Sequence, residues 1–341
     1  MRMRCAGAAL AAMVWAQSLA AQDGPVGTLL VANMDDDSVW LVDIETGLRR
    51  ATVPTRIAPH EVAVSADGRT AAVTNYGDER GPGNLVQVFD VTSGDVIGEF
   101  EVEGYQRLHG AAFLPGDSLL ILTSERTGEL LVVGLHDGGI RRTLPTGGQA
   151  THMLALGGEW VYAANITSGT VSRIDLSGRS AARAWPAGTR TEGVAATPDG
   201  LEGWTGSMDG GTVVGVRGED GEVVATIEGL QVPYRLAVTP DGATVVVSDP
   251  EAHELVLIDR ASGTLSARVD VAAASAEAGL GGEPSPQGFV LSRDGRWAFV
   301  SAKAINRVAV VDLAGWRVVR FLEAGVGPDG IGFSPVRGGG A

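Results

Sequence analysis

A short alternation of apolar and polar residues, often closed by an Asp-Gly turn, recurs along the whole chain. Its clearest copy is PHEVAVSADG at residues 59–68, and six further copies begin at residues 108, 151, 191, 233, 286 and 328. Alternation with a period of two is typical of a half-buried β-strand, and Asp-Gly is typical of a tight turn. The sequence therefore predicts seven equivalent strands.

Three more strand patterns accompany each copy. A second, apolar run ends in a small polar residue, as at 71–75, 161–165 and 244–249. A third run alternates at 38–43, 85–90 and 307–312, and a more polar fourth run follows, such as 95–102. Repeats of roughly 40–50 residues with four strands each are typical of β-propeller blades. We expect hydrogen bonds to local turn amides from the aspartates that end the third strands: Asp43, Asp90, Asp175, Asp259 and Asp312.

The two ends of the chain are predicted to complete one blade together. Residues 29–53 supply its second to fourth strands, and residues 330–334 supply its first. With six complete blades, this predicts one domain over residues 27–335, a seven-bladed propeller of four antiparallel strands per blade. Closure by both termini leaves no open sheet edge. No helical periodicity is present, so the predicted class is all-β, and residues 336–341 are predicted to form a disordered tail.

Short motifs at the ends of the second and third strands add a family resemblance. They read AVTN at residues 72–75, YAAN at 162–165 and LID at 257–259. With the strand–turn phrase, this pattern resembles the YVTN family of seven-bladed propellers over essentially the whole predicted domain. The resemblance implies the fold but no single activity, because that family includes surface-layer-like proteins and exported proteins of unassigned role. Related propellers include lactonases and a streptogramin lyase.

Two connections are longer than the rest. Residues 76–84 separate the second and third strands of one blade, and residues 272–287 separate the last two complete blades. The first strand of a blade runs away from the top face and the second returns to it, so both insertions are predicted on the top face. Loops carry function more often than scaffold strands do, and a merely tolerated insertion is an equal alternative.

The first residues resemble a cleaved export signal. Arg2 and Arg4 precede a short apolar run over residues 5–16, and Ser18-Leu19-Ala20 offers small residues where a signal peptidase cuts. Residues 1–20 are therefore predicted to be a signal peptide, and the mature protein is predicted to be periplasmic or secreted. No later segment has the ~18 uninterrupted apolar residues of a membrane-spanning helix.

The net charge and the cysteine content limit which partners and which metal ligands are expected. The net charge is −15, which disfavours nucleic acids and anionic membrane surfaces as partners. Cys5 is the single cysteine and lies in the predicted signal, so the mature chain is expected to lack disulfides and cysteine ligands. A small molecule or a protein at the top face is the expected partner, and a monomer is the expected state.

The residue immediately before each first strand is the strongest functional candidate, and we call these the slot residues. They lie 40–53 residues apart on successive blades and are predicted to point at the mouth of a central channel. In chain order the slot residues are His60, His109, His152, Glu192, Tyr234, Gln287 and Asp329. Three of the five histidines thus occupy one structural position on consecutive blades, with a carboxylate on the next blade.

Three imidazoles beside a carboxylate suit a divalent metal. The predicted ligands are His60, His109, His152 and Glu192. Imidazole nitrogen suits Zn, Cu, Fe or Ni, and three protein ligands leave a position for water or substrate. A polar mouth without a metal, in which the histidines bond backbone or water, is the alternative. No other cofactor is predicted.

Three residues of the same region are catalytic candidates. Glu192 could act as a general base on metal-bound water, and Tyr234 with Arg235 could hold or polarise an anionic substrate. Lys303 is expected to form an ion pair. Each metal-bound imidazole needs a hydrogen-bond acceptor for its other ring nitrogen, which fixes its orientation. The residues at the ends of the second strands are placed to supply these acceptors: Asn75, Glu125, Asn165 and Asp209.

Three functions are compatible with these residues. The first is an exported module that binds a ligand or partner through its top face, with a divalent metal at the channel mouth. The second is a metal-dependent lyase or lactonase that uses the same His/Glu cluster, which rests mainly on analogy between folds. The third is a structural interaction scaffold without chemistry.

Overall fold

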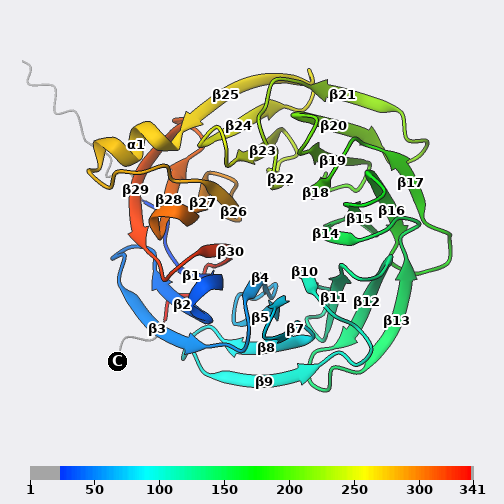
Figure 1. Ribbon diagram of the computed structural model, residues 1–341, viewed down its shortest axis with the longest axis horizontal. Helices are drawn as coiled ribbons and strands as arrows, with labels where there is room; N and C mark the ends of the chain where they lie inside the picture. The colour runs from blue at the N-terminus through cyan, green and yellow to red at the C-terminus, as the bar shows by residue number, and fades with distance from the viewer. Residues whose placement is uncertain (1–23, 339–341) are drawn as a thin grey trace, which may run out of the picture.

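The computed structural model describes residues 24–338 and confirms the predicted seven-bladed propeller. Seven four-stranded antiparallel sheets of these residues stand around a common axis (Figure 1). The expected signal peptide, residues 1–20, lies outside the described residues, as do residues 339–341 of the expected tail. Of that tail, Val336 is described, and its carbonyl accepts a hydrogen bond from Thr28 Oγ1 at 2.8 Å.

Six blades are built in chain order from the axis outward, and the closing blade takes its innermost strand from the end of the chain. The innermost strands are β4 (Pro59–Val64), β10 (Leu108–Phe113), β14 (Thr151–Gly157), β18 (Thr191–Ala196), β22 (Leu236–Val238), β26 (Pro286–Leu291) and β30 (Pro328–Ser334). The second strands are β1 (Thr28–Asn33), β5 (Thr70–Asn75), β11 (Leu119–Ser124), β15 (Trp160–Asn165), β19 (Glu202–Ser207), β23 (Thr244–Asp249) and β27 (Trp297–Ala302).

The outer half of each blade repeats in the same way. The third strands are β2 (Ser38–Asp43), β8 (Leu85–Asp90), β12 (Glu129–Gly134), β16 (Thr170–Asp175), β20 (Thr212–Arg217), β24 (Glu254–Asp259) and β28 (Arg307–Asp312). The outermost strands are β3 (Arg49–Pro54), β9 (Val96–Glu101), β13 (Ile140–Pro145), β17 (Arg183–Pro186), β21 (Val223–Ile227), β25 (Thr264–Asp270) and β29 (Arg317–Glu323).

The ring is closed by the two ends of the chain, as predicted. Strand β30 pairs antiparallel with β1, with Thr28 opposite Ser334, so one blade has the order β3-β2-β1-β30. This pairing removes the open edge that an unclosed sheet would present.

The core lies between blades. A separate cluster of buried apolar residues fills each of the seven blade interfaces in the described chain. At the closing blade, for example, Phe299 and Phe333 stack with ring centroids 5.4 Å apart. Because every sheet is covered on both faces, the second strands are apolar at consecutive positions and do not alternate, as in β27, which is buried throughout.

The aspartates that end the third strands bond local turn amides, as predicted. Asp43 Oδ1 accepts the Thr46 N–H at 2.8 Å, and Asp90 and Asp259 accept in the same way at 2.8 Å from Ser93 and Ser262. Equivalent bonds are made by Asp175 and Asp312. These carboxylates therefore belong to the fold.

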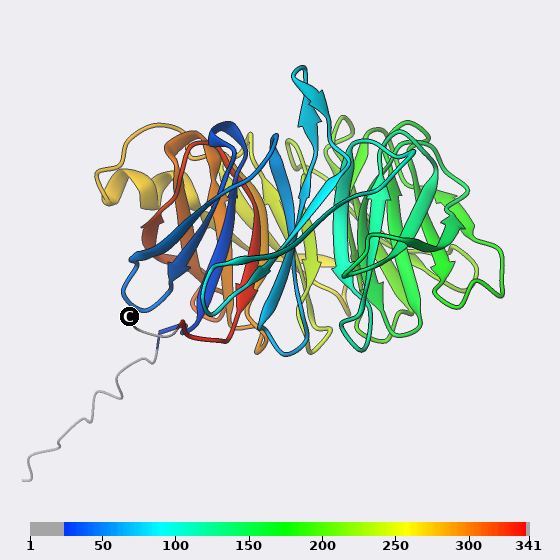
Figure 2. The ribbon, with the colours of Figure 1, turned by 90° about the horizontal axis from the view of Figure 1, so that it is seen from below.

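The two long connections differ in structure. Strands β6 (Gly77–Asp78) and β7 (Gly81–Pro82) form a hairpin that projects above the rest of the top face (Figure 2). The second connection contains one short helix, α1 (Val271–Glu277), that the sequence pattern did not indicate. Alanine-rich sequence favours helix, and Asp270 caps it by accepting the Ala273 N–H. Seven residues are two turns, too few to show periodicity. Two short 3₁₀ turns, η1 (Met34–Asp36) and η2 (Lys303–Ile305), complete the described elements.

No helix within residues 24–338 has the length and apolarity needed to cross a bilayer.

Neighbouring innermost strands approach each other unusually closely. A Cβ added at Gly193 would overlap the carbonyl oxygen of Tyr234 on the next blade, and one at Gly330 would overlap that of His60. The obstacle in both cases is backbone of an adjacent blade, which cannot rotate away as a side chain can. Glycine is therefore required at these positions for the ring to close.

We expect Gly193→Ala to lower the free energy of unfolding by about 1–3 kcal/mol, because the added methyl forces two blades apart. Gly98→Ala is the matched control, since its Cβ would make ordinary contacts of 3.6 Å or more with Val88. That variant should be as stable as the wild type or slightly more so, because alanine is less flexible than glycine. Urea unfolding midpoints measure both changes, and an unchanged midpoint for Gly193→Ala would contradict the steric argument.

Candidate ligand and metal site at the propeller axis

In six of the seven blades, a β-bulge brings two consecutive residues to the axis. In β4, Pro59 pairs with Asn75 and Val62 pairs with Val73, so His60 and Glu61 together lie opposite the single residue Thr74. The same shift of register occurs in β10, β14, β18, β26 and β30. A bulge interrupts the alternation of side chains between the two faces of a strand. The residue after the slot residue therefore also reaches the axis.

A hydroxyl on each of several second strands holds the bulge and the next blade together. Thr74 Oγ1 accepts the Glu61 N–H at 3.3 Å and donates to the carbonyl of His109 at 2.8 Å. Thr123 Oγ1 likewise accepts the Gly110 N–H at 2.8 Å and donates to the carbonyl of His152 at 2.5 Å. Ser248 and Ser301 donate in the same way to Gln287 and Asp329. These bonds position the slot residues relative to one another.

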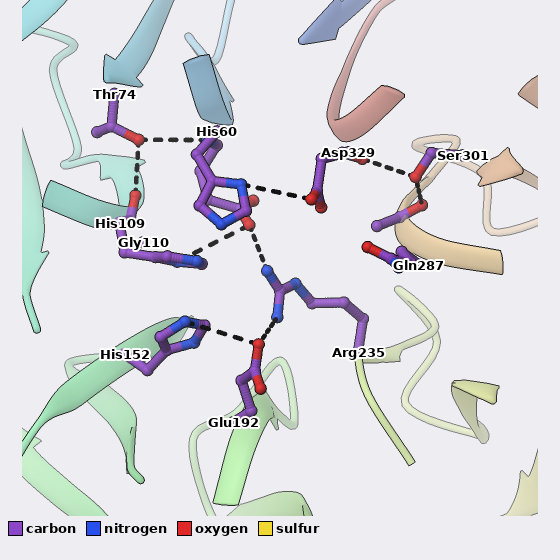
Figure 3. A network of polar contacts seen from close by, with 12 residues as sticks. His60, Thr74, His109, Gly110, His152, Glu192, Arg235, Gln287, Ser301 and Asp329 are labelled. Atoms are coloured by element: carbon purple, nitrogen blue, oxygen red, sulfur yellow. Dashed lines mark hydrogen bonds and ion pairs between the residues drawn. The ribbon is translucent and has the colours of Figure 1, made fainter. Parts of the chain in front are cut away.

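The three imidazoles form one continuous row at the axis (Figure 3). The ring centroids of His60 and His109 are 4.1 Å apart, and those of His109 and His152 are 3.6 Å apart. All three side chains are buried, and His109 is 0% exposed. The structure thus places the three histidines side by side, which their shared position on the blades alone did not establish.

Charged side chains surround this row in two groups. On one side, Asp329 Oδ2 lies 3.7 Å from His60 Nδ1 and accepts a hydrogen bond from Lys303 at 2.9 Å. The expected ion pair of Lys303 is thereby confirmed. On the other side, the Arg235 guanidinium lies between two carboxylates, donating to Glu61 Oε1 at 2.8 Å and lying 3.5 Å from Glu192 Oε1. We call the three histidines with Glu61, Glu192, Arg235 and Asp329 the axial cluster.

His152 connects the axial cluster to the projecting hairpin. Its Nε2 lies 3.6 Å from Glu192 and 3.8 Å from Glu125, and Glu125 accepts a hydrogen bond from the Tyr76 hydroxyl. Burial, together with the Glu125 carboxylate, raises the pKa of Tyr76 to about 12. Tyr76 stands at the base of the hairpin, so this chain of contacts runs from the imidazole row toward the top face.

Burial controls the charge of the imidazoles. It lowers the pKa of His109 and His152 well below the usual value, and it lowers the pKa of His60 despite the nearby Asp329 carboxylate. The cationic Arg235 adds to the effect on all three. The row is therefore composed of neutral imidazoles, which is the form that binds metals.

The carboxylates of the axial cluster respond differently. Burial raises the pKa of Glu61 and of Glu192, and the attraction of Arg235 only partly opposes this. Burial also acts on Asp329, but His60, Lys303 and Arg235 outweigh it and hold the pKa of that carboxyl below its usual value. Burial raises the pKa of Tyr234 well above its usual value, so its phenol stays protonated.

Several buried polar atoms of the axial cluster have no hydrogen-bond partner among the described residues. They are both ring nitrogens of His109, Nδ1 of His60 and of His152, Nε and Nη1 of Arg235, and Oδ1 of Asp329. Buried polar groups are nearly always satisfied, so a concentration of unpaired atoms in one place needs an explanation. A bound ion or ligand would supply the missing partners.

The described residues contain one group that could hold a metal ion, formed by His60, Glu61 and His109. One donor atom from each lies within 4.8 Å of the others. Of the four predicted ligands, His60 and His109 belong to this group, whereas His152 and Glu192 do not. Glu192 lies on the opposite side of Arg235 from Glu61.

The remaining predicted site residues have distinct places. Arg235 stacks over Tyr234 with its Cζ 4.5 Å from the ring centroid, and Gln287 faces the same axis (Figure 3). Of the residues expected to orient imidazoles, Glu125 approaches His152, as described. The expectation was wrong for the other three, since Asn75 and Asn165 bond neighbouring loops and strands and Asp209 pairs with Arg190.

Glu61 is the functional candidate that sequence reasoning missed. Strict alternation places the residue after a slot residue on the opposite face of the strand, and the bulge that overrides this leaves no mark in a single repeat. Comparing the residue that follows the slot residue in all seven blades could have identified Glu61. The position after the slot residue is glycine in four blades and charged in two, as Glu61 and Arg235, and those two side chains form the central ion pair.

Comparison with solved structures supports the fold. The similar chains include a functionally unknown protein from Desulfotomaculum acetoxidans (TM-score 0.72, 16% identity, 90% of this chain and 99% of that chain). They also include hydrazine synthase of Kuenenia stuttgartiensis (0.69, 21%, 84% and 93%) and the periplasmic gluconolactonase PpgL of Pseudomonas aeruginosa (0.69, 17%, 91% and 99%). No family model matches the chain, and no curated protein matches its sequence. At identities this low, the structural similarity shows a shared propeller fold and no more. The YVTN resemblance stays a prediction.

Because the buried imidazoles are neutral, we expect the protein to become less stable as the pH is lowered. Above about pH 6.5 histidine is neutral in both the folded and the unfolded chain. Below that pH, His109 binds a proton in the unfolded chain but stays neutral when it is buried in the folded protein. The free energy of unfolding therefore decreases as the pH falls. The raised pKa values of Glu61 and Glu192 oppose this trend at lower pH, because those groups take up protons more readily when folded.

We therefore expect the wild type to lose about 1 kcal/mol more stability than His109→Gln between pH 7.5 and 5.5. Urea unfolding at both pH values, with a chelator present, measures the difference. Equal losses in the two proteins would show that the imidazole of His109 is not held neutral by burial.

Proposed function

We propose that this protein is an exported, small-molecule-binding propeller that holds a divalent transition metal at its axis and takes its ligand from the top face. The observation that carries the proposal is the group His60, Glu61 and His109, whose donor atoms lie within 4.8 Å of one another. Both nitrogens of His109 lack a hydrogen-bond partner among residues 24–338. Export is part of the same proposal and rests on the sequence of residues 1–20 alone.

The chemistry of the donors favours zinc or a neighbouring first-row metal. Two imidazoles and one carboxylate form a ligand set used by catalytic zinc, which keeps a fourth position open. Zinc bonds of about 2 Å place tetrahedral donors about 3.3 Å apart, so the present side chains would close inward on binding. Arg235 donates a hydrogen bond to Glu61 and so orients its carboxylate, as hydrogen-bond partners of metal ligands commonly do.

Two carboxylates of the axial cluster stay within reach of a ligand. Glu61 and Glu192 keep 15% and 13% of their side chains exposed, whereas the histidines beside them are almost completely buried. His152 and Glu192 would then face the ligand beyond the metal. A purely structural scaffold does not account for so many buried polar atoms without partners.

We expect the purified mature protein to bind one Zn²⁺ per chain in isothermal titration calorimetry. His109→Ala and Glu61→Gln should each weaken binding at least about tenfold, because each removes a direct ligand from a three-residue set. His136→Ala is the control, since His136 is exposed and lies outside the axial cluster. Wild-type affinity in both ligand variants, or no binding by the wild type, would refute the metal site.

A second candidate is hydrolysis of lactones, which one feature of the axial cluster supports. Glu192, whose pKa is raised by burial, lies 3.6 Å from the neutral imidazole of His152. A neutral base beside a carboxyl group of raised pKa is the kind of pair that general acid–base catalysis uses. The periplasmic gluconolactonase among the similar structures is an analogy of fold only.

If the protein is a lactonase, it should hydrolyse glucono-δ-lactone faster than the spontaneous rate, and Glu192→Gln should lose at least about 100-fold of that activity. His136→Ala should retain it. Repeating the assay with a chelator would show whether a metal takes part. A rate equal to the spontaneous one would discard the enzyme and leave the binding proposal in place.

A further inference from the structure

Arg235 has a large unused capacity for hydrogen bonding at the axis. Its side chain is only 6% exposed, and Nη2 donates to Glu61 at 2.8 Å. Nη1 lies 3.5 Å from Glu192 without a hydrogen bond, and Nε has no acceptor within the described chain. A buried guanidinium normally satisfies most of its five N–H groups, so these donors are available to an anionic ligand.

The charge of the axial cluster nevertheless opposes an anion. Three carboxylates, those of Glu61, Glu192 and Asp329, face two cationic groups, those of Arg235 and Lys303. The neutral imidazoles contribute nothing, so one negative charge is in excess when the carboxylates are ionised. At the rim, Arg107 stacks on Tyr76, and the hydroxyl of Tyr76 donates to Glu125. The positive charge of Arg107 and the negative charge of Glu125 cancel. A divalent cation would reverse the sign of the whole cluster.

Glu61 links the two halves of the cluster through a single atom. Its Oε1 accepts the hydrogen bond from Arg235 at 2.8 Å and lies 3.9 Å from Nδ1 of His109. The guanidinium and the proposed metal position therefore lie on either side of one carboxylate oxygen. A metal bound to Glu61 withdraws charge from that oxygen, so the positive charge of Arg235 is less compensated and its unpaired Nη1 and Nε attract another acceptor more strongly.

We propose that the ligand of this protein carries a carboxylate that binds the metal and Arg235 together, and that it binds only after the metal. The inference rests on the metal site proposed above. A carboxylate presents two oxygens on one carbon, so one can fill the open metal position while the other accepts a charge-assisted hydrogen bond from the guanidinium. The short distance between the two sites favours this planar group over a bulkier tetrahedral oxyanion.

The experiment uses the mature protein loaded with Co²⁺, whose visible absorption reports on its coordination, and acetate as the probe. Sodium acetate should change the cobalt spectrum and raise the Tm of the loaded protein, while sodium chloride at equal ionic strength should not. The metal-free protein should show no rise in Tm with acetate, because a ligand stabilises only the state that binds it.

Three variants locate the acetate. At saturating Co²⁺, Arg235→Lys should weaken acetate binding at least tenfold, since lysine keeps the charge but lacks the planar set of N–H groups that can donate to Glu61 and to acetate at once. Glu192→Gln should strengthen acetate binding, because it removes the carboxylate that faces Nη1, and this gain keeps the test informative if Arg235→Lys unfolds. Arg190→Lys is the control, as Arg190 is an exposed top-face arginine paired with Asp209, and it should leave acetate affinity unchanged.

The outcomes separate the two proposals. If Co²⁺ does not bind, the metal site and the carboxylate site fall together. If Co²⁺ binds and acetate leaves its spectrum unchanged, the metal site stands and the carboxylate site is refuted. Equal acetate binding by the metal-free protein, or full affinity in Arg235→Lys, also overturns it. Sulfate binding as tight as acetate would overturn the assignment to a carboxylate.

Discussion

In four of the seven blades, a hydrogen bond through the hydroxyl of one threonine or serine underlies the arrangement of the propeller axis. Thr74 Oγ1 receives the N–H that the bulge in β4 leaves unpaired and donates to the carbonyl of His109 on the following blade. The same bond joins Thr123 to His152. Where the next blade comes nearest, glycine leaves the space for this contact: a Cβ at Gly288 would overlap the carbonyl of Asp329, to which Ser301 donates. The spacing of the slot residues follows from this contact.

This spacing has an electrostatic consequence at the axis. Seven strands packed so tightly bury whatever their slot residues carry, and in this chain they carry three imidazoles and several charges. Burial makes neutral histidine the favoured form and raises the pKa of Glu61 and Glu192. Removing charged groups from water is costly unless they are paired, so the ion pair of Glu61 and Arg235 is needed for both to lie there. A site with neutral imidazoles and one shared carboxylate is the result.

The conformation of the peripheral turns and loops is less constrained than that of the axis, because water can satisfy their polar groups. The aspartates that end the third strands bond their own turns, so their role is local and identical from blade to blade. The long connections are limited only by where they must start and end, which is why one forms the hairpin of β6 and β7 and the other forms α1. Variation of this kind leaves the geometry of the axis unchanged.

The sequence by itself determined the propeller, its seven blades and the closure by both termini, because strand periodicity, turn residues and repeat length are local properties repeated along the chain. It also indicated that His60, His109 and His152 occupy equivalent positions. Only the tertiary structure decided that Glu61, and not Glu192, stands beside His60 and His109. A bulge changes which side chains face the axis without changing the residues that form it. The partner of Glu61 is Arg235, 174 residues away, and a contact at that separation is created only when the ring closes.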